Sequence, residues 1–447
     1  MIFMFFPIIM LVDYNIYKGI EMLINRPEYI EKLKQLQGKP GLVKVITGIR
    51  RCGKSKLLEL FQNHLKETGV PNNRIININF EDLANEKYLD YQKLHEHILA
   101  STKPNKMNYV FLDEVQLAPN WIKAVNSLRL KQNIDIYLTG SNARMMDDDL
   151  HNELGGRWMG IKMMPLSFKE FESWQNKNYV KSNDAAVNNF KRAAALPEIY
   201  NKYITQSGFP ETFEFNGNQK LINDYLANTI YRDTIQRDIV KKYKINDTTK
   251  LDDTVRYAFD NTGKEISFLN IEKDLAASGR KVDSETVGNY IKRLQDCFML
   301  YKCERYDIKG RKLLSTNAKY YVADSGLRYA ILGHQDRDTG RTLENTVYLE
   351  LLRRGYNVYA GKIGKKTKIE GEEVPLEVDF IAEKNGGREY YQVSWNVLGN
   401  EKVLKREYAS LEEIRDNYPK YLLTMDIGNG GQEGIERLNV LDWLMGD

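Results

Sequence analysis

The sequence contains little cysteine and little histidine. Three cysteines in 447 residues, Cys52, Cys297 and Cys303, are too few for a disulfide framework, which points to a reducing compartment. Of the five histidines only His95 and His97 are close together, and two residues apart on a helix they face different ways. A zinc site is therefore not expected. The cysteine usage predicts a cytoplasmic protein.

The sequence also lacks a strong charge of either sign. Its 65 Lys and Arg residues against 61 Asp and Glu leave a formal net charge of +4, too small by itself to indicate a nucleic-acid-binding protein. Any basic surface must therefore be local. A hydrophobic fraction of 42% and a charged fraction of 28% are ordinary for soluble proteins. At roughly 150 residues per domain, the length predicts about three domains.

The apolar run near the start, residues 2–12, is too short to cross a bilayer. It has 11 residues, where roughly 20 are needed. No Lys or Arg precedes it, and Asp13 follows where a signal peptide needs a small-residue cleavage site. The run is either a buried hydrophobic segment or upstream sequence read in frame before a true start at Met22. We expect residues 1–21 to lie outside the folded core, with no membrane association.

From residue 22 the sequence alternates between helix and strand patterns. Residues 42–47 are β-branched and short enough for a buried strand, and an amphipathic helix follows through Leu57, Phe61 and Leu65. We predict a helix at residues 27–37 and further strands at residues 75–80, 109–112 and 134–139. Strands alternating with helices predict an α/β fold, with a parallel sheet covered on both faces, over residues 22–165.

The rest of the chain divides into a helical part and a second α/β unit. Residues 166–245 look helical, with residues 181–189 polar enough for a loop. Residues 246–335 hold three short helical patterns and then two alternating segments, 300–308 and 313–322. The C-terminal unit is predicted to contain helices at residues 343–353 and 402–416 and strands at residues 357–360, 376–382, 389–393 and 420–424.

A phosphate-binding loop lies between the first strand and the amphipathic helix. The run Gly48-Ile49-Arg50-Arg51-Cys52-Gly53-Lys54-Ser55 satisfies G-x-x-x-x-G-K-[ST]. The glycines let backbone N–H groups wrap phosphates, and the helix that follows offers its positive end. Lys54 would reach the β and γ phosphates, and the Ser55 hydroxyl is a hard ligand for Mg²⁺. A tight turn with a surface lysine is the alternative, and the strand–loop–helix context disfavours it.

A pair of acids ends the strand predicted at residues 109–112. Asp113 and Glu114 would lie at the carboxyl edge of the sheet, where ligands of such sheets bind. Taken alone, an acidic pair after a strand is usually a helix N-cap. Together with the phosphate loop, the pair predicts that Asp113 holds Mg²⁺, directly or through water. Glu114 would then orient or deprotonate an attacking water.

Three weaker candidates complete the predicted site. Ser141 and Asn142 end the next strand and could sense the γ phosphate through a water, although ordinary turn chemistry also explains them. Arg157 is either an arginine finger or a packed surface arginine. Cys52, inside the loop, is either oxidisable or, as we favour, a small filler.

These motifs resemble those of the bacterial and archaeal AAA-type ATPases that carry a C-terminal domain of unknown function. The resemblance covers about residues 23–430. It rests on Arg26 to Tyr29, Ile46 to Ser55, Leu112 to Gln116 and Leu138 to Asn142, and also on Ser207 to Glu211 and Tyr231 to Ile235, which look like the family's helical lid. It implies ATP binding, a P-loop NTPase sheet, a winged-helix unit in the middle and a restriction-endonuclease-like fold at the end. It also places the start near Met22.

The winged-helix interpretation has support from the residues themselves. Residues 266–276 lead into a second helix, capped by Ser284, with apolar positions three or four residues apart. Residues 298–314 could form the wing hairpin, with five basic residues near its turn: Lys302, Arg305, Lys309, Arg311 and Lys312. Over residues 262–312 there are 11 Lys and Arg against 8 Asp and Glu, an excess of +3. The wing could contact DNA phosphates through Lys309, Arg311 and Lys312, contact a protein or be a solvated basic hairpin.

The C-terminal unit has the order of a restriction-endonuclease-like core with part of its active site missing. Glu344 or Glu350 lies on a helix and Asp379 on a strand. Active enzymes of this type pair two carboxylates for a divalent metal with a lysine on the final strand. Here Gln392 and Ser394 hold the places of the second acid and the lysine. Lys402 or Lys405 from the next helix could replace the lysine. We interpret the unit as a nuclease-like scaffold without nuclease activity.

These observations predict a five-part chain. The parts are residues 1–21 (extension), 22–165 (P-loop ATPase), 166–245 (helical lid or linker), 246–335 (winged helix) and 336–447 (nuclease-like). The predicted function is that of a Mg²⁺-dependent ATPase that moves its C-terminal domains against a protein or DNA partner. An ATP-gated protein that binds or cleaves DNA and a nucleotide-binding interaction module without turnover are the alternatives. The sequence leaves the oligomeric state open.

Overall fold

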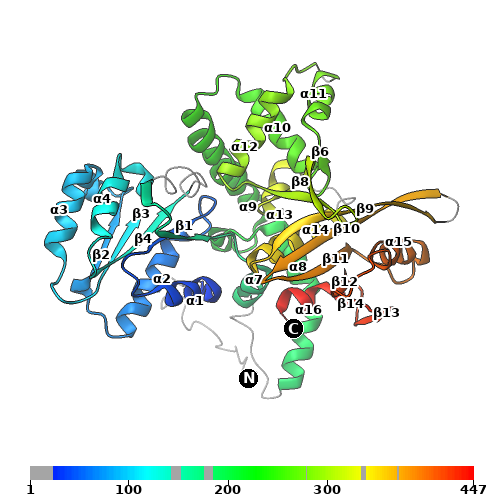
Figure 1. Cartoon of the computed structure of the whole chain (residues 1–447), viewed down its shortest axis with the longest axis horizontal. Helices are drawn as coiled ribbons and strands as arrows, with labels where there is room; N and C mark the ends of the chain where they lie inside the picture. The colour runs from blue at the N-terminus through cyan, green and yellow to red at the C-terminus, as the bar shows by residue number, and fades with distance from the viewer. Residues whose placement is uncertain are drawn as a thin grey trace, which may run out of the picture.

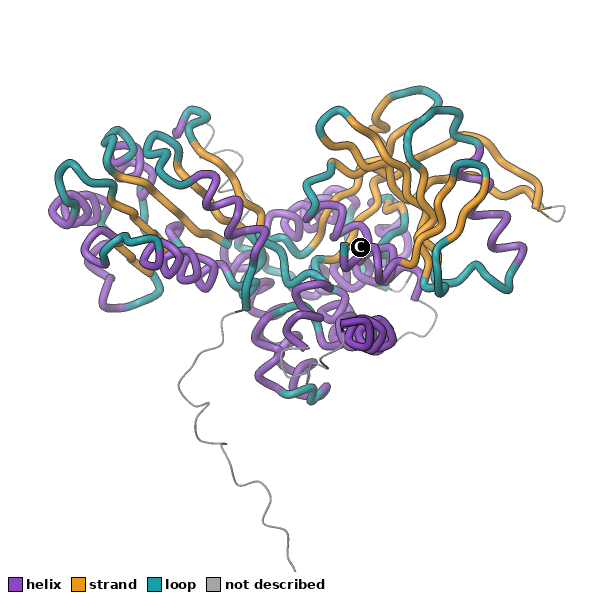
Figure 2. Tube along the Cα trace, turned by 90° about the horizontal axis from the view of Figure 1, so that it is seen from below, coloured by secondary structure: helices purple, strands orange, loops and turns teal. Residues whose placement is uncertain are grey.

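The computed structural model describes residues 24–141, 153–175, 185–277, 279–333, 339–369 and 372–446. The apolar run at residues 2–12, Met22 and Asn142 lie outside the described residues. Two β-sheets lie on opposite sides of the molecule, and a helical region lies between them in both views (Figures 1 and 2). No helix among the described residues is long and apolar enough to cross a membrane.

The N-terminal sheet is fully parallel and has the strand order β2-β3-β4-β1-β5. Its strands are β1 (Val43–Thr47), β2 (Ile75–Asn79), β3 (Asn108–Asp113), β4 (Ile134–Gly140) and β5 (Trp158–Lys162). The first four confirm the predicted strands. The sequence missed β5 because this edge strand is only partly buried and shows neither a β-branched run nor a regular alternation.

Helices cover both faces of this sheet, as predicted. They are α1 (Pro27–Leu36), α2 (Lys54–Glu67), α3 (Tyr91–Ser101) and α4 (Trp121–Leu128), with short 3₁₀ turns η1 (Asn72–Arg74), η2 (Leu83–Leu89) and η3 (Val115–Leu117). Because successive strand residues point to opposite faces, Phe111 and Tyr137 belong to the core under α1 and α2. Their neighbours Val110 and Leu138 belong to the core under α3 and α4.

The middle of the chain is helical, which confirms the prediction for residues 166–245. It contains α7 (Phe168–Gln175), α8 (Ala185–Gln206), η5 (Pro210–Phe215), α9 (Gln219–Tyr225) and two π-helical segments, η6 (Leu226–Tyr231) and η7 (Thr234–Lys241). The predicted loop at residues 181–189 is wrong from residue 185 onward. There α8 begins with two alanines, which have the highest helix propensity. Residues 181–184 lie outside the described residues.

Three helices and a hairpin follow in the predicted order: α10 (Thr248–Asp260), α11 (Phe268–Ala277), α12 (Ser284–Asp296), and the strands β7 (Leu300–Asp307) and β8 (Lys312–Val322). A short strand β6 (Glu265–Ile266) pairs with β8. The N-cap of α12 is Asp283, whose side chain accepts a hydrogen bond from the backbone N–H of Thr286. The predicted cap at Ser284 is therefore displaced by one residue.

The hairpin and the C-terminal unit share one nine-stranded sheet, with the order β13-β14-β12-β11-β10-β9-β7-β8-β6. Strand β7 pairs in parallel with β9, so the predicted boundary at residues 335 and 336 does not coincide with a break in the sheet. The remaining elements are α13 (Ser325–Leu332), α14 (Thr339–Arg353), β9 (Asn357–Ile369), β10 (Glu372–Lys384), β11 (Gly387–Ser394), α15 (Glu401–Glu412), β12 (Lys420–Thr424), β13 (Gly430–Gln432), β14 (Ile435–Asn439) and α16 (Val440–Met445).

Candidate functional site

The loop between β1 and α2 is held open by two glycines and a neighbouring strand end. A Cβ on Gly48 would lie 2.0 Å from the carbonyl oxygen of Met163, which follows β5, so no larger residue fits there. Gly53 adopts a φ of +100° and forms the N-cap of α2. This conformation favours glycine and turns the loop into the helix. The backbone of residues 48–53 is thereby shaped as an anion-binding loop at a helix N-terminus.

Lys54 is the first residue of α2, and its side chain folds into the loop. Its ammonium donates hydrogen bonds to the carbonyl oxygens of Gly48 (3.1 Å) and Ile49 (3.3 Å). It also lies 3.8 Å from Glu114 Oε1, and the lysine is 4% exposed. A buried cation in a loop of this shape places positive charge where phosphates would bind.

The predicted acids Asp113 and Glu114 lie at the carboxyl end of β3, beside the loop. Burial raises the pKa of Asp113, and its interactions with the hydroxyls of Thr139 and Ser55 oppose that rise. Glu114 has a φ of +52°, in the left-handed region that non-glycine residues rarely adopt. Strained backbone of this kind concentrates at functional sites, where the surrounding structure holds it.

Two residues from neighbouring segments position these acids. The Thr139 hydroxyl, at the end of β4, donates to Asp113 and accepts a hydrogen bond of 2.9 Å from the Glu114 backbone N–H. The Gln116 side-chain amide donates to Glu114 Oε2 and lies 3.5 Å from the Ser141 hydroxyl. The sequence singled out neither Thr139 nor Gln116 as a site residue, although both belong to the motifs that carry the family resemblance.

The other predicted loop residues are tied to different parts of the chain. Arg50 donates two hydrogen bonds, of 2.7 and 2.9 Å, to the carboxylate of Asp238 on η7. Arg51 has a φ of +61° and interacts electrostatically with Glu211. Cys52 is fully buried, and burial raises the pKa of its thiol, which suppresses the reactive thiolate. Cys52 is thus packed as the small filler that the sequence analysis favoured.

Arg26, from the motif before α1, fixes the back of the loop. Its guanidinium donates to the carbonyl oxygens of Cys52 (3.2 Å) and Met164 (2.8 Å) and to Glu170 (2.8 Å) on α7. The Tyr29 hydroxyl accepts a hydrogen bond from the Met164 backbone N–H. These contacts join the N-terminal segment, the loop and the start of the helical region.

The structure does not bring Arg157 to the phosphate loop of its own chain. Arg157 precedes β5, which runs parallel to β1 with Trp158 opposite Val43, whereas the loop follows the other end of β1. Its side chain is exposed at the edge of the sheet where the strands begin. The role of Arg157 as an arginine finger therefore stays a prediction. An arginine finger here would have to serve a neighbouring molecule.

Ser141 and a small cavity complete the surroundings of the loop. Ser141 is buried directly after β4, which places the predicted γ-phosphate sensor beside Gln116. A cavity of about 230 Å³ adjoins the loop on its other side. Its lining is mostly apolar and includes Ile24, Gly53, Leu57, Met163 and Pro210. Such a cavity suits a flat, largely apolar group.

In the C-terminal unit the structure supplies a positive charge that the sequence analysis considered missing. Lys319, on β8, lies 3.4 Å from Glu344 Oε1 on α14 and acts electrostatically on Asp379. Lys402 and Lys405 on α15, the predicted replacements for a lysine on the last strand, are both exposed, and Lys405 pairs with Glu401. The cluster therefore contains a lysine, Lys319, although the sequence predicts that its positive charge is missing.

The acids of this cluster are partly or fully buried but do not form a recognisable metal site. Glu344 belongs to the cluster, whereas Glu350 pairs with Arg354 at 2.9 Å elsewhere. The Gln392 amide donates to Glu407 (2.7 Å), and Asp379 accepts a hydrogen bond from the backbone N–H of Val393 (2.8 Å). Among the described residues, no group of three His, Cys, Asp or Glu residues is arranged to hold a metal ion.

The sheet order, the phosphate loop and the acids beside it define a P-loop NTPase of the AAA type. A family described as "AAA domain" matches residues 41–172, and a "Domain of unknown function (DUF8612)" matches residues 197–338. An uncharacterized protein of Haemophilus influenzae is 32% identical over 426 residues, 95% of this chain and 99% of that protein. Uncharacterized protein MJ1544 of Methanocaldococcus jannaschii is 27% identical over 437 residues, 94% and 91% of the two chains.

The chain therefore belongs to the family of AAA-type P-loop ATPases that carry a C-terminal domain of unknown function. A solved structure, the Walker-type ATPase of Pyrococcus abyssi, matches with a TM-score of 0.45 and 17% identity, over 69% of this chain and 95% of that chain.

Proposed function

We propose that the protein is a Mg²⁺-dependent ATPase. The observation that carries the proposal is the convergence of Lys54, Asp113 and Glu114 on one phosphate-binding loop. Lys54 lies 3.8 Å from Glu114, and Thr139 joins Glu114 to Asp113. Phosphoryl transfer needs positioned water and neutralised charge more than covalent help, and these residues provide both.

Each side chain has a separate task in this proposal. The backbone N–H groups of the loop and the N-terminus of α2 hold the β phosphate, and Lys54 neutralises charge between the β and γ phosphates. The Ser55 hydroxyl and the Asp113 carboxylate are hard oxygen donors that would hold Mg²⁺, and the ion would supply positive charge to the phosphates. Glu114 takes the proton of the attacking water, while Gln116 fixes the orientation of its carboxylate.

The cavity beside the loop supports a nucleotide with a large base. Its apolar wall adjoins Gly53 and Leu57, the residues at the start of the helix that follows the loop. A base in this cavity would contact Pro210, which lies in the predicted lid motif at residues 207–211. Nucleotide binding would then bring the lid and the phosphate loop together.

We further propose that nucleotide state is passed to the C-terminal domains through the helical region. Arg50 ties the loop to η7, and Arg26 ties it to α7. The division into parts at residues 22–165, 166–245, 246–335 and 336–447 is part of this proposal. The C-terminal domains would move against a partner that is a protein or DNA. The exposed residues Lys309, Arg311 and Lys312 at the hairpin turn favour DNA. Ser141 would respond to the γ phosphate bound by its own chain. Arg157 would respond to the γ phosphate bound by a neighbouring molecule.

The C-terminal unit is proposed to act as a scaffold without nuclease activity. Gln392 replaces an acid of the expected metal pair and is occupied by its hydrogen bond to Glu407. Lys319 supplies a cation to the cluster but does not replace the missing acid.

Equilibrium binding of a fluorescent ATP analogue tests the nucleotide site. Lys54→Ala should reduce affinity at least tenfold, because the lysine is the charge that meets the phosphates. Lys66→Ala, an exposed lysine at the other end of α2, is the matched control and should bind like the wild type. An equal loss of ATP affinity in both variants, or no loss in either, would refute the assignment of Lys54 to the phosphate site.

A further inference from the structure

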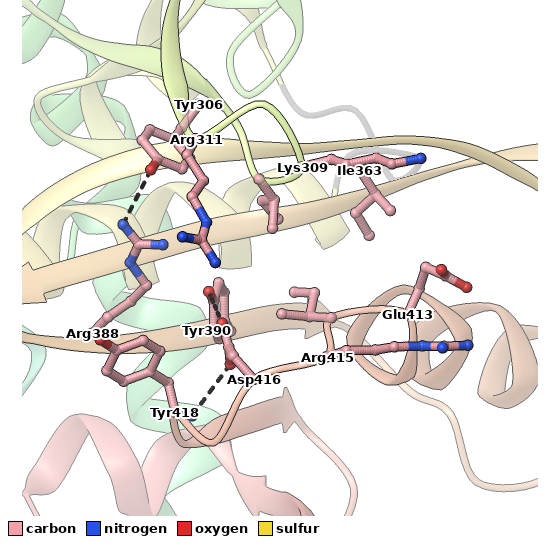
Figure 3. Close-up of a pocket in the computed structure, with 12 residues that line it drawn as sticks. Tyr306, Lys309, Arg311, Ile363, Arg388, Tyr390, Glu413, Arg415, Asp416 and Tyr418 are labelled. Atoms are coloured by element: carbon pink, nitrogen blue, oxygen red, sulfur yellow. Dashed lines mark hydrogen bonds between the residues drawn. The ribbon is translucent and has the colours of Figure 1, made fainter.

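A second large cavity lies far from the phosphate loop, in the C-terminal sheet (Figure 3). It measures about 630 Å³. One wall is the turn between β7 and β8, and the opposite wall is the loop between α15 and β12. The floor includes Arg388 and Tyr390 at the start of β11. Nothing in the proposed ATPase chemistry uses this cavity.

Three cations lie on the rim of the cavity. Lys309 and Arg311 come from the hairpin turn and Arg415 from the facing loop, and all three are exposed. None of them makes an ion pair within the described part of the chain, whereas Arg305, Arg354, Arg388 and Arg406 each pair with a glutamate. Figure 3 shows Lys309 and Arg415 on opposite walls of the cavity, both extending toward the same side of the view. The cavity therefore carries positive charge on both of its walls.

Tyrosine rings gather at the other end of the cavity. The Arg388 guanidinium lies 5.0 Å from the ring centroid of Tyr306 and 5.9 Å from that of Tyr418. Tyr418 is 44% exposed. The hydroxyl of Tyr390 donates to Asp416 at 2.6 Å, which engages one of the two acids that line the cavity. Tyr418 thus presents an exposed ring next to the cations.

We propose that this cavity binds a single strand of nucleic acid. A base would stack on the exposed ring of Tyr418, and successive phosphates would meet Arg311, Lys309 and Arg415. Rings beside a line of unpaired cations are how proteins bind single strands without reading their sequence. A duplex hides its base faces and could use only the cations. This inference deepens the partner part of the proposed function and does not depend on ATP turnover.

Fluorescence anisotropy with labelled oligothymidylate and oligouridylate, each of roughly 20 nucleotides, tests the proposal without ATP. For whichever of the two oligonucleotides the wild type binds, the Kd of the charge-reversal variant Arg311→Glu/Arg415→Glu should be at least tenfold higher than that of the wild type. Three phosphate contacts at ~0.7 each predict a log–log salt slope of about −2 for the wild type, and the variant should lose most of it. Tyr418→Ala should raise the Kd about tenfold with the slope unchanged.

The matched control is Lys106→Glu/Lys131→Glu, which makes the same change in net charge at exposed positions of the ATPase domain. It should bind like the wild type. Lys54→Ala should also keep its strand affinity, so failure of the ATPase assignment would not affect this test. The proposal is overturned by an absence of strand binding, by equal losses in the pocket and control variants, by tighter binding of a duplex or an acidic peptide, or by an unchanged Kd in Tyr418→Ala.

Discussion

The guanidinium of Arg50 forms a bidentate ion pair with Asp238, 188 residues further along the chain. The two N···O distances are 2.7 and 2.9 Å. Arg50 belongs to the predicted phosphate-binding loop and Asp238 to a π-helical segment of the helical region, so the loop is joined directly to the part of the chain that leads to the C-terminal sheet. Paired hydrogen bonds of this kind fix orientation as well as distance.

This pair should couple nucleotide binding to the helical region. Because both side chains are partly exposed, we expect a coupling free energy of only about 1 kcal/mol between Arg50→Ala and Asp238→Ala. A double-mutant cycle on ATP affinity measures it. The exposed pair Lys202 and Glu198 gives the control cycle, which should show no coupling to nucleotide. Additive effects of the Arg50 and Asp238 substitutions on ATP affinity would contradict this coupling.

Thr139 should be needed for both stability and turnover. Thr139→Val keeps the shape of the side chain but leaves the Asp113 carboxylate and the Glu114 N–H without their buried partner. We expect a loss of about 1–3 kcal/mol in the free energy of unfolding, measured in urea, and a clear fall in kcat. Thr139→Ser retains the hydroxyl and should recover most of both quantities. Full activity in the valine variant would exclude the positioning role.

Removal of Mg²⁺ should weaken ATP binding only in proteins that keep the Ser55 hydroxyl as a ligand for the ion. Ser55→Ala lacks the hydroxyl beside Asp113, so its ATP affinity should differ little between Mg²⁺ and EDTA. The wild type and Ser173→Ala, an exposed serine on α7, should lose affinity in EDTA. The same EDTA effect in Ser55→Ala as in the wild type would argue against the metal assignment.

Asp379 should make stability fall as pH rises. Burial, followed by the charge of Glu344, raises the pKa of Asp379 well above its usual 3.8. The folded state then holds this proton more tightly than the unfolded chain, so the contribution of Asp379 decreases as pH rises from about 4 through the raised pKa. Relative to the wild type, Asp379→Asn should therefore be more stable at about pH 8 than at about pH 5. Urea unfolding measures the difference. A difference that does not change with pH would contradict the shifted pKa.

The local parts of the nucleotide site could be predicted from the sequence. The strand, loop and helix around Lys54 are adjacent in the chain, and Asp113 and Glu114 end an apolar strand of recognisable composition. Their proximity follows from the rule that parallel strands end at one edge of the sheet. The position of Arg157 could not be predicted, because neither a β-branched run nor a regular alternation marks β5, whose direction puts that arginine at the opposite edge of the sheet.

Contacts between distant segments could not be predicted. Asp238 is an ordinary polar position on a helix until the fold places it against Arg50. Lys319 lies in a strand assigned to the wing, and only the sheet that joins β7 to β9 brings that strand beside α14. The cavity with Arg415 and Tyr418 likewise joins a hairpin turn to a loop about 100 residues away. A single sequence carries no signal for such pairings.

The most direct test of the ATPase assignment is single-turnover phosphate release by the wild type and Glu114→Gln, with ATP affinity measured on the same samples. The variant keeps the size of the side chain and removes the base. The proposed chemistry predicts that it binds ATP like the wild type and releases phosphate at least 100-fold more slowly, on the order of a lost general base. Release at the wild-type rate, or no release by the wild type itself, would contradict it.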